Sequence, residues 1–333
     1  MKALVTGGAG FIGSSLCESL VARGDLVVAL DNFSSGSMSN LSRLRKETSF
    51  IAMKRNVRTK ELAQILGDTD AVFHFAANPE VRLDKVDSMT NFEENVISTQ
   101  AVLEAIRRSS THTLVFASSS TVYGDAKIRP TPEDYSPLMP ISVYGGCKLA
   151  SEALCVAYAK TYGFNLTILR FANIVGKRSN HGVVPDFVRK LNTDQTVLEI
   201  LGDGSQRKSY LHIDDCVSAI ITATSLSNGV SILNVGSGDQ IGVRDVADIV
   251  CEEMRLNPRY RFTGGVDSGR GWKGDVKDMF LEISRLRSLG WEPKYDSVES
   301  IRMTTRQMLS LASSTWRPPS HLRNFHAREP SQG

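Results

Sequence analysis

Tyr144 and Lys148 stand four residues apart in a stretch whose pattern predicts a helix over residues 143–162. Residues at this spacing lie on one helix face, one turn apart, so both side chains can act on one ligand. A free tyrosine titrates near pH ~10, but a nearby ammonium and a positively charged ring would favour the phenolate. The pair is a candidate base for a hydroxyl proton, although this spacing alone is more often a solvated helix face.

A run of hydroxyl side chains follows the apolar strand predicted over residues 113–118. The run is Ser118, Ser119, Ser120 and Thr121. Parallel sheets present the carboxyl ends of their strands to ligands, so a hydroxyl here can bridge a substrate oxygen and Tyr144.

Three glycines, Gly7, Gly10 and Gly13, lie between a predicted strand and a predicted helix. They allow a tight turn and a close approach of backbone to a pyrophosphate, and the helix N-terminus offers free N–H groups. Asp31 follows about 18 residues after Gly13, where this fingerprint places the acid that binds a ribose. Residues 32–35 include no Arg or Lys, which favours NAD over NADP. The alternative is a merely structural turn, with Asp31 capping a loop.

These residues need a sheet to position them, and the pattern predicts one. Apolar strands over residues 25–31, 71–76, 113–118 and 165–170 alternate with helical stretches. This alternation is typical of an α/β fold with a Rossmann-type, doubly wound parallel sheet.

The chain becomes less regular after about residue 176, which predicts a smaller α/β lobe for the substrate. Helices are predicted in it over residues 243–254 and 298–311. The expected domains are an NAD-binding domain over 1–175 with returning segments from about 208–240, a mainly substrate-binding lobe over 176–311, and a flexible tail over 312–333.

The composition and charge of the chain argue against several classes of protein, namely nucleic-acid-binding, metal-binding and membrane-spanning proteins. A net charge of +3 is too small to indicate nucleic acid. The five cysteines include no CxxC pair and are expected to be buried and reduced. His74 and His212 have no second ligand at metal spacing, so no metal is expected. No apolar run approaches the roughly 20 residues of a membrane helix, and the chain begins directly with a strand, so we expect a soluble, cytoplasmic protein.

The sequence resembles the extended short-chain dehydrogenase/reductase superfamily and, within its NAD-dependent epimerase/dehydratase family, the UDP-glucose 4-epimerases, especially those of archaeal type. The resemblance extends to about residue 310. It is carried by TGGAGFIG at 6–13, DNFSSG at 31–36, HFAA at 74–77, NV at 95–96, SSSTVYG at 118–124, Tyr144 with Lys148, RFAN at 170–173 and GWKGDV at 271–276.

The resemblance implies that Ser119 is the catalytic hydroxyl, with Thr121 beside it, and that Tyr144 and Lys148 complete the catalytic group. It implies that Tyr144 removes the C4 hydroxyl proton while the C4 hydride passes to bound NAD⁺, after which the keto sugar rotates and hydride returns to its other face. It also implies a homodimer, through a bundle that includes the helix after Tyr144.

The resemblance further implies two binding sets. The residues expected at NAD are Gly7, Gly10, Phe11, Ile12, Gly13, Asp31, Asn32, Ser34, Ser35, Gly36, Asn56, Val57, Phe75, Ala76, Ala77, Asn95, Ser118, Tyr144, Lys148 and Phe171. Those expected at a UDP-sugar are Ser119, Ser120, Tyr144, Asn173, Gly182, Val183, Val184, Phe187, Arg207, Lys208, Tyr210 and Arg270.

The sequence departs from the family pattern in places. The 4,6-dehydratases of the family carry an Asp-Glu pair where Ser120 and Thr121 stand, so dehydration is not expected. The family has arginines at the positions of Lys208 and Trp272, so the diphosphate contacts are open, with Arg207 or Arg270 as substitutes.

We therefore expect a UDP-hexose 4-epimerase. The alternatives are an epimerase of N-acetylhexosamine or uronate forms, a net NAD-dependent dehydrogenase or reductase of the superfamily, and a non-catalytic binding protein. The intact Ser119, Tyr144 and Lys148 argue against the last.

Overall fold

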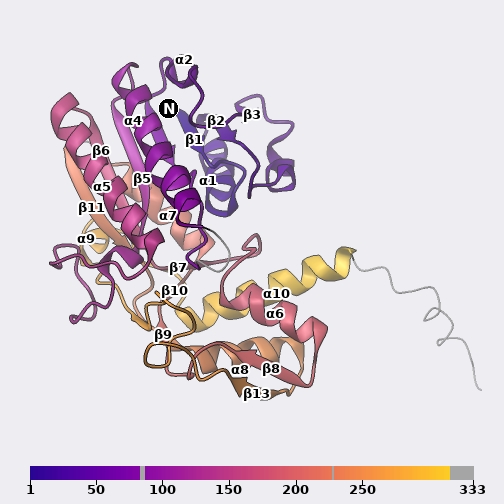
Figure 1. The fold of residues 1–333 in the computed structure, drawn as a ribbon. Coiled ribbons are helices and arrows are strands. Elements are labelled where there is room, and N and C mark those ends of the chain that lie inside the picture. Colours follow the sequence, from indigo (N-terminus) through magenta and orange to yellow (C-terminus); the bar gives the residue numbers. More distant parts are fainter. Residues whose placement is uncertain (83–86, 227–228, 316–333) are drawn as a thin grey trace, which may run out of the picture.

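The computed structural model describes residues 1–82, 87–226 and 229–315. A seven-stranded sheet forms its centre, in the order β11-β6-β5-β4-β1-β2-β3, and all of its neighbouring strands are parallel (Figure 1). This confirms the predicted Rossmann-type sheet. Its strands are β1 Lys2–Thr6, β2 Leu26–Asp31, β3 Phe50–Lys54, β4 Ala71–His74, β5 Thr113–Ser119, β6 Asn165–Phe171 and β11 Val230–Val235.

Helices cover both faces of the sheet because alternate residues of each buried strand point to opposite sides. On one face, Val5 of β1 belongs to the same apolar core as Leu16 of α1 (Phe11–Ala22) and Ile220 of α7 (Ile213–Ala223). On the other face, Leu4 shares a core with Cys155 of α5 (Val143–Tyr162). That second layer also contains α2 Leu62–Leu66, α4 Ser98–Arg107, and the short helices α3 Ser88–Asn91 and η2 Phe92–Ile97 that lead into α4.

A smaller lobe lies beyond the carboxyl edge of the sheet (Figure 1). Its core joins helices and short strands around residues such as Phe187, Ile200 and Ile301. The elements here and at the junction are β7 Asn173–Val175, α6 Val183–Thr193, β8 Val197–Ile200, β9 Arg207–Lys208, β10 Tyr210–His212, β12 Ile241–Gly242, α8 Val243–Met254, β13 Arg259–Phe262, β14 Asp278–Met279, α9 Ser284–Arg287 and α10 Ser297–Thr315. Two 3-10 helices, η1 Met38–Leu44 and η3 Ser120–Tyr123, flank the sheet edge.

Helix α5 has the predicted bounds, and its end signals are local. The Ser142 hydroxyl accepts a hydrogen bond from the Gly145 N–H (3.0 Å), which satisfies one free donor of the first turn. Gly163 ends the helix in the left-handed conformation (φ +76°). Helix α10 is longer than predicted and reaches Thr315, and the rest of the predicted tail, 316–333, lies outside the described residues.

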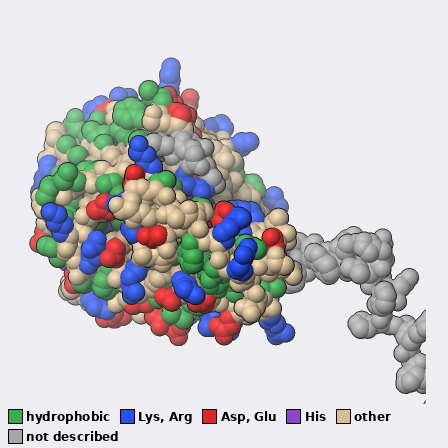
Figure 2. All heavy atoms as spheres, turned by 60° about the horizontal axis from the view of Figure 1, so that its bottom comes forward, with side chains coloured by type: hydrophobic (Ala, Val, Ile, Leu, Met, Phe, Trp, Pro, Cys, Tyr) green, Lys and Arg blue, Asp and Glu red, His purple; other side chains and the backbone are tan. Residues whose placement is uncertain are grey.

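All five cysteines are free and buried, as predicted. Among the described residues, none of the helices combines the length and apolar character needed to cross a membrane. On the face of the small lobe seen in Figure 2, Lys and Arg side chains are interspersed with Asp and Glu, in line with the small net charge.

Candidate active site

The turn after β1 accepts only glycine at its tightest points. Gly7 has φ +68°, and a Cβ there would lie 2.7 Å from the backbone nitrogen of Ala76; a Cβ on Gly13 would lie 2.2 Å from the Gly7 carbonyl oxygen. Helix α1 begins at Phe11, and its N-cap, Gly10, has no side chain to bond the N–H groups of the first turn. These donors are therefore open to an anion such as a pyrophosphate.

The Asp31 carboxylate holds the next loop against this turn. One oxygen accepts the Ala9 N–H (2.9 Å) and the other accepts the Phe33 N–H (2.7 Å). A Cβ on Gly36 would lie 2.9 Å from the carboxylate, so the loop also requires a small residue there. Because a carboxylate has about four acceptor sites, Asp31 still has capacity for ribose hydroxyls. The turn and this acid together fit the adenosine diphosphate part of NAD.

The other residues predicted to bind the cofactor lie after the strands β2, β3 and β4, at the end of β6, in the first turn of α1 and on η2. Phe75, directly after β4, packs against Phe171 at the end of β6, with ring centroids 6.1 Å apart. Asn95 is buried, and its amide donates to the carbonyl of Asn91 (2.9 Å). Val57 lies in the core beside the sheet, so its side chain is not available to a ligand. Ala76 and Ala77 follow Phe75, Asn32, Ser34 and Ser35 lie in the exposed loop after β2, Asn56 follows β3, and Ile12 is in the first turn of α1.

The predicted catalytic side chains meet at the carboxyl end of β5. The Ser119 hydroxyl accepts hydrogen bonds from the Thr121 N–H (3.2 Å) and the Thr121 hydroxyl (3.0 Å). Burial raises the pKa of Tyr144 to about 12, and a hydrogen bond with the Ser119 side chain partly offsets this rise. Ser120 lies in η3 between the two hydroxyl residues.

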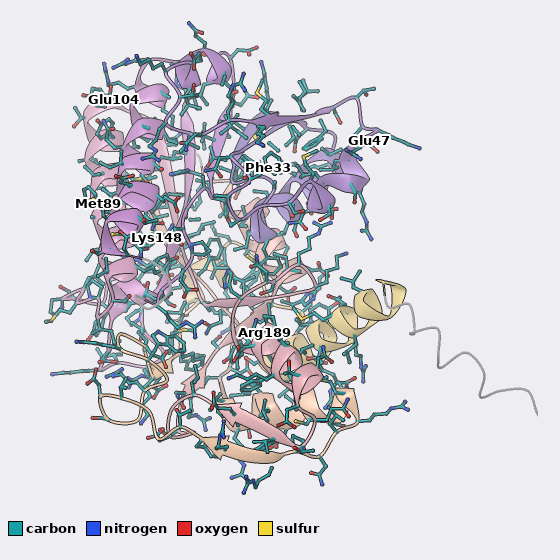
Figure 3. All side chains as sticks on the ribbon, turned by 45° about the vertical axis from the view of Figure 1, so that its right-hand side comes forward. Phe33, Glu47, Met89, Glu104, Lys148 and Arg189 are labelled. Atoms are coloured by element: carbon teal, nitrogen blue, oxygen red, sulfur yellow. The ribbon has the colours of Figure 1, made fainter. Side chains whose placement is uncertain are left out.

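Lys148 is buried and lies on α5, one turn after Tyr144. Figure 3 labels Lys148. Its ammonium donates to the Ala117 carbonyl (2.9 Å) and lies 5.8 Å from the centre of the Tyr144 ring. Burial lowers the pKa of Lys148 to about 8, and the nearby Cys155, Glu152 and Cys147 act in the opposite direction. Without a ligand, the site therefore disfavours charge on both Tyr144 and Lys148.

Sequence reasoning missed a buried ion pair beneath this group. Glu152 lies four residues after Lys148, and its two carboxylate oxygens accept hydrogen bonds from Nε and Nη2 of Arg170 (3.0 and 2.7 Å). Both side chains are almost fully buried, and Glu152 also accepts a hydrogen bond from the Ser118 hydroxyl. The pair therefore links α5 to β5 and β6 beside the catalytic group. The spacing from Lys148 was the only local signal for Glu152.

The predicted diphosphate cations are mostly held by carboxylates. Lys208 pairs with Asp275 (2.6 Å). Arg270 pairs with Asp125 (2.7 Å) and donates to the Asp275 carbonyl (2.6 Å). Arg207 is exposed.

Trp272 was noted in the sequence only as a departure from the family. Two cations lie over its indole ring, with the Arg82 guanidinium 5.9 Å and the Lys208 ammonium 5.3 Å from the ring centre. Its buried Nε1–H has no hydrogen-bond partner among the described residues. A Cβ on Gly274 would lie 2.9 Å from the Ile141 carbonyl, so the turn over 270–275 packs against the chain just before α5. Trp272 therefore lies where the small lobe meets the carboxyl edge of the sheet, at which Ser119, Tyr144 and Lys148 lie. We call this edge the catalytic edge.

The remaining predicted substrate residues offer mainly backbone. The side chains of Val184, Phe187 and Tyr210 belong to the core of the small lobe, which removes them from direct ligand contact. Gly182 (φ +99°) precedes α6, Val183 begins it, and the Asn173 amide donates to the Ser209 carbonyl (3.1 Å).

A parallel sheet with a glycine turn, an acid after its second strand and a Ser-Tyr-Lys group at its carboxyl edge defines a dinucleotide-dependent enzyme of the extended short-chain dehydrogenase/reductase type. Residues 3–236 match the model of the NAD dependent epimerase/dehydratase family. The chain belongs to this family, and its cofactor is NAD.

Similar proteins extend over nearly the whole chain. A putative UDP-glucose 4-epimerase of Methanocaldococcus jannaschii is 31% identical over 92% of this chain and 97% of its own. A crystal structure of a UDP-galactose 4-epimerase is 42% identical, with a TM-score of 0.83, and covers 95% of this chain and 100% of its own. The UDP-glucuronic acid 4-epimerase of Bacillus cereus, in complex with UDP-glucuronic acid and NAD, is 28% identical, with a TM-score of 0.85 over 93% of this chain and 100% of its own.

Proposed function

We propose that this enzyme interconverts the C4 epimers of a UDP-hexose, UDP-glucose and UDP-galactose, and retains its NAD through each turnover. The observation that carries the proposal is the hydrogen-bonded Ser119 and Tyr144 at the sheet edge, with Lys148 one turn away. Family relatives include 4-epimerases of UDP-glucose and UDP-galactose. Ser120 and Thr121 supply no carboxylate pair for an elimination, which argues against a dehydratase.

In the proposed reaction, Tyr144 takes the proton of the C4 hydroxyl and later returns it, while Ser119 bridges Tyr144 and that oxygen. When bound, NAD would supply the hydride acceptor and donor, and its oxidised form would add positive charge. Burial holds the pKa of Tyr144 near 12, so the phenolate needs positive charge from its surroundings. The Lys148 ammonium, fixed by the Ala117 carbonyl, provides part of it.

The substrate is expected to extend from this edge toward the small lobe, with its diphosphate near Lys208 and Trp272. This placement rests on the resemblance and on the position of the 270–275 turn against the chain before α5. Lys208 already pairs with Asp275, so a diphosphate has to compete for this cation or share it.

We also propose that the enzyme is a homodimer. Met89, Phe92 and Ile97, on the segment that leads into α4, expose 61%, 44% and 38% of their surfaces. Met89 and Glu104 lie along one outer edge of the sheet domain (Figure 3). Exposed apolar side chains on one segment suit a self-complementary interface. Sedimentation analysis of the wild type and of a Phe92→Lys variant tests it, and a monomeric wild type would exclude it.

The function is tested by incubating the purified protein with UDP-galactose without added cofactor and following UDP-glucose by chromatography. Conversion supports epimerisation with retained NAD, and the Tyr144→Phe variant should show none. Parallel reactions with UDP-N-acetylglucosamine and UDP-glucuronic acid identify the preferred sugar. No conversion of any of these, together with NADH formation when NAD is supplied, would contradict the proposal and indicate a net dehydrogenase.

A further inference from the structure

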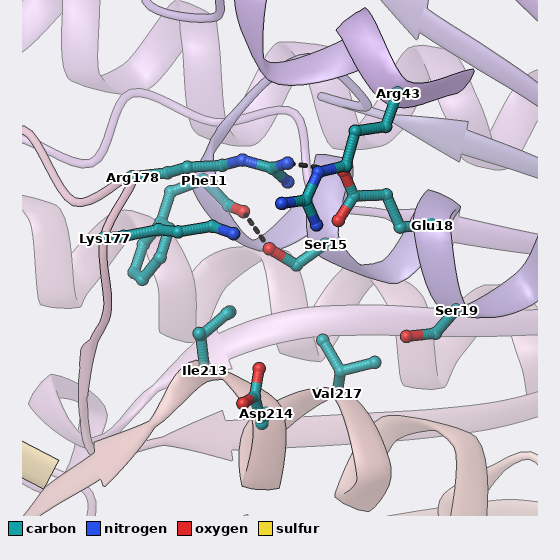
Figure 4. Close-up of a pocket in the computed structure, with 10 residues that line it drawn as sticks. All are labelled: Phe11, Ser15, Glu18, Ser19, Arg43, Lys177, Arg178, Ile213, Asp214 and Val217. Carbon is teal, nitrogen blue, oxygen red and sulfur yellow. Dashed lines mark hydrogen bonds and ion pairs between the residues drawn. The ribbon is translucent and has the colours of Figure 1, made fainter. Parts of the chain in front are cut away.

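A pocket of about 390 Å³ opens on the face of the sheet opposite to α5 (Figure 4). It lies between α1 and α7, and the chain that follows β7 closes one side of it. The central sheet separates this pocket from Lys148, whose helix packs on the other face. Its volume lies in the range of small-molecule sites. It is lined by Phe11, Ser15, Glu18, Ser19, Arg43, Lys177, Arg178, Ile213, Asp214 and Val217.

Three cations from two segments of the chain, Arg43 and the adjacent Lys177 and Arg178, converge on the pocket (Figure 4). Arg178 is engaged, since it pairs with Glu18 and donates to the Ser14 hydroxyl (3.1 Å). Arg43 and Lys177 have no hydrogen bond or ion pair with any other residue in the described part of the chain. The pocket therefore contains two cations whose charge is not neutralised by a direct partner.

The two carboxylates of the lining do not remove this excess. Glu18 is occupied by Arg178, and the Asp214 side chain is 70% exposed to water. Burial lowers the pKa of Lys177, and the positive charges of Arg43 and Arg178 lower it further. The carboxylates of Glu18 and Asp214 act on this pKa in the opposite direction but offset the repulsion among the cations only in part, and a bound anion would relieve it.

The rest of the lining indicates what kind of anion fits. Ile213 and Val217 form a buried apolar wall, while the half-buried Ser19 of α1 adds a hydroxyl. Two cations and a hydroxyl suit the several oxygens of a phosphate group, and the apolar wall suits an organic part. We propose that this pocket binds a small phosphorylated molecule, with its phosphate between Arg43 and Lys177, at a site that shares Phe11 with the expected NAD site but lies on the face of the sheet opposite to Lys148.

The test uses NAD-loaded enzyme saturated with UDP, so that the cofactor and substrate sites are filled. Inorganic phosphate, AMP and adenosine are titrated by calorimetry at low salt. We expect saturable binding of AMP, weaker binding of phosphate and none of adenosine. Arg43→Gln and Lys177→Gln should each weaken AMP binding by about ten-fold, the loss of one charge-assisted contact.

Arg45→Gln is the matched control, because Arg45 is exposed next to the same 3-10 helix and does not line the pocket. This variant should bind AMP like the wild type. NAD retention and melting temperature should be unchanged in all three variants, which separates loss of the ligand from loss of the fold. Absence of saturable AMP binding to the wild type, or equal binding by the Arg43→Gln/Lys177→Gln double variant, would overturn the proposal. Epimerase activity does not enter this measurement, so its outcome is independent of the proposed reaction.

Discussion

Lys148 at the catalytic edge and Lys208 at the small lobe differ in the partners of their ammonium groups. Lys148 is buried, and among the described residues its ammonium has only a backbone carbonyl as hydrogen-bond partner. Lys208 is paired directly with the buried carboxylate of Asp275. The Lys148 ammonium lies beside the phenol ring of Tyr144 without a direct carboxylate partner among the described residues, whereas the Lys208 ammonium is already bonded to a carboxylate. Changes at the catalytic edge should therefore alter the rate of the chemical step, and changes at the lobe should alter substrate affinity.

The largest expected effect is that of Tyr144→Phe. Removing the proposed base should lower kcat by about 10³-fold, within the range known for general acid–base groups, with UDP affinity unchanged. The matched control is Tyr158→Phe on the same helix, whose hydroxyl binds Glu104 at the outer surface and should not matter for the rate. Steady-state kinetics with UDP-galactose measures both variants. A kcat within a few-fold of wild type for Tyr144→Phe would show that Tyr144 is not the base.

The next prediction concerns the buried ion pair of Glu152 and Arg170, which lies beside the catalytic residues. Glu152→Gln leaves the buried Arg170 charge without its carboxylate, which should lower the free energy of unfolding by about 3 kcal/mol. The exposed pair of Arg58 and Glu93 offers the contrast, because Glu93→Gln should cost about 1 kcal/mol or less. Urea denaturation of both variants makes the measurement. Equal stabilities would mean that burial does not distinguish the catalytic edge from an ordinary surface.

Lys148→Met should change the pH dependence of turnover. The proposed reaction needs Tyr144 deprotonated and Lys148 protonated, so kcat should fall below the lower of their two pKa values and above the higher one. Removing the cation raises the pKa of Tyr144, which moves the acidic limb to higher pH and lowers kcat near pH 7 by about 10²-fold. Lys160→Met, at the exposed end of α5, is the control. An unmoved acidic limb would show that Lys148 does not act through the charge of Tyr144.

The smallest effect is expected at the lobe. Trp272→Arg places a cation beside Lys208 without removing the Asp275 pair, so the KM for the UDP-sugar should fall about three- to ten-fold while kcat stays close to wild type. Trp272→Phe keeps the charge unchanged and should not lower KM. A fall in kcat without a change in KM would place Trp272 with the catalytic edge instead.

Local patterns in the sequence were sufficient for the scaffold and for the shape of the catalytic edge. The glycine spacing, the acid after the second strand and the helix over residues 143–162 are short-range features, because each depends on a turn, a cap or one helix face. Gly7 and Gly13 cannot carry a side chain without meeting backbone atoms, so their type alone defines the turn. For the same reason Tyr144 and Lys148 were placed together by their spacing.

Only the tertiary structure decided which charges remain available. Arg270 is paired with Asp125, 145 residues away, and Lys208 with Asp275, 67 residues away. The pocket that contains Arg43 and Lys177 is likewise formed by segments that lie far apart in the sequence. No periodicity encodes such partners, because they are selected by the packing of whole elements against one another. The sequence therefore determined which residue types stand at the sheet edge, and the fold determined which of its charges are free to meet a ligand.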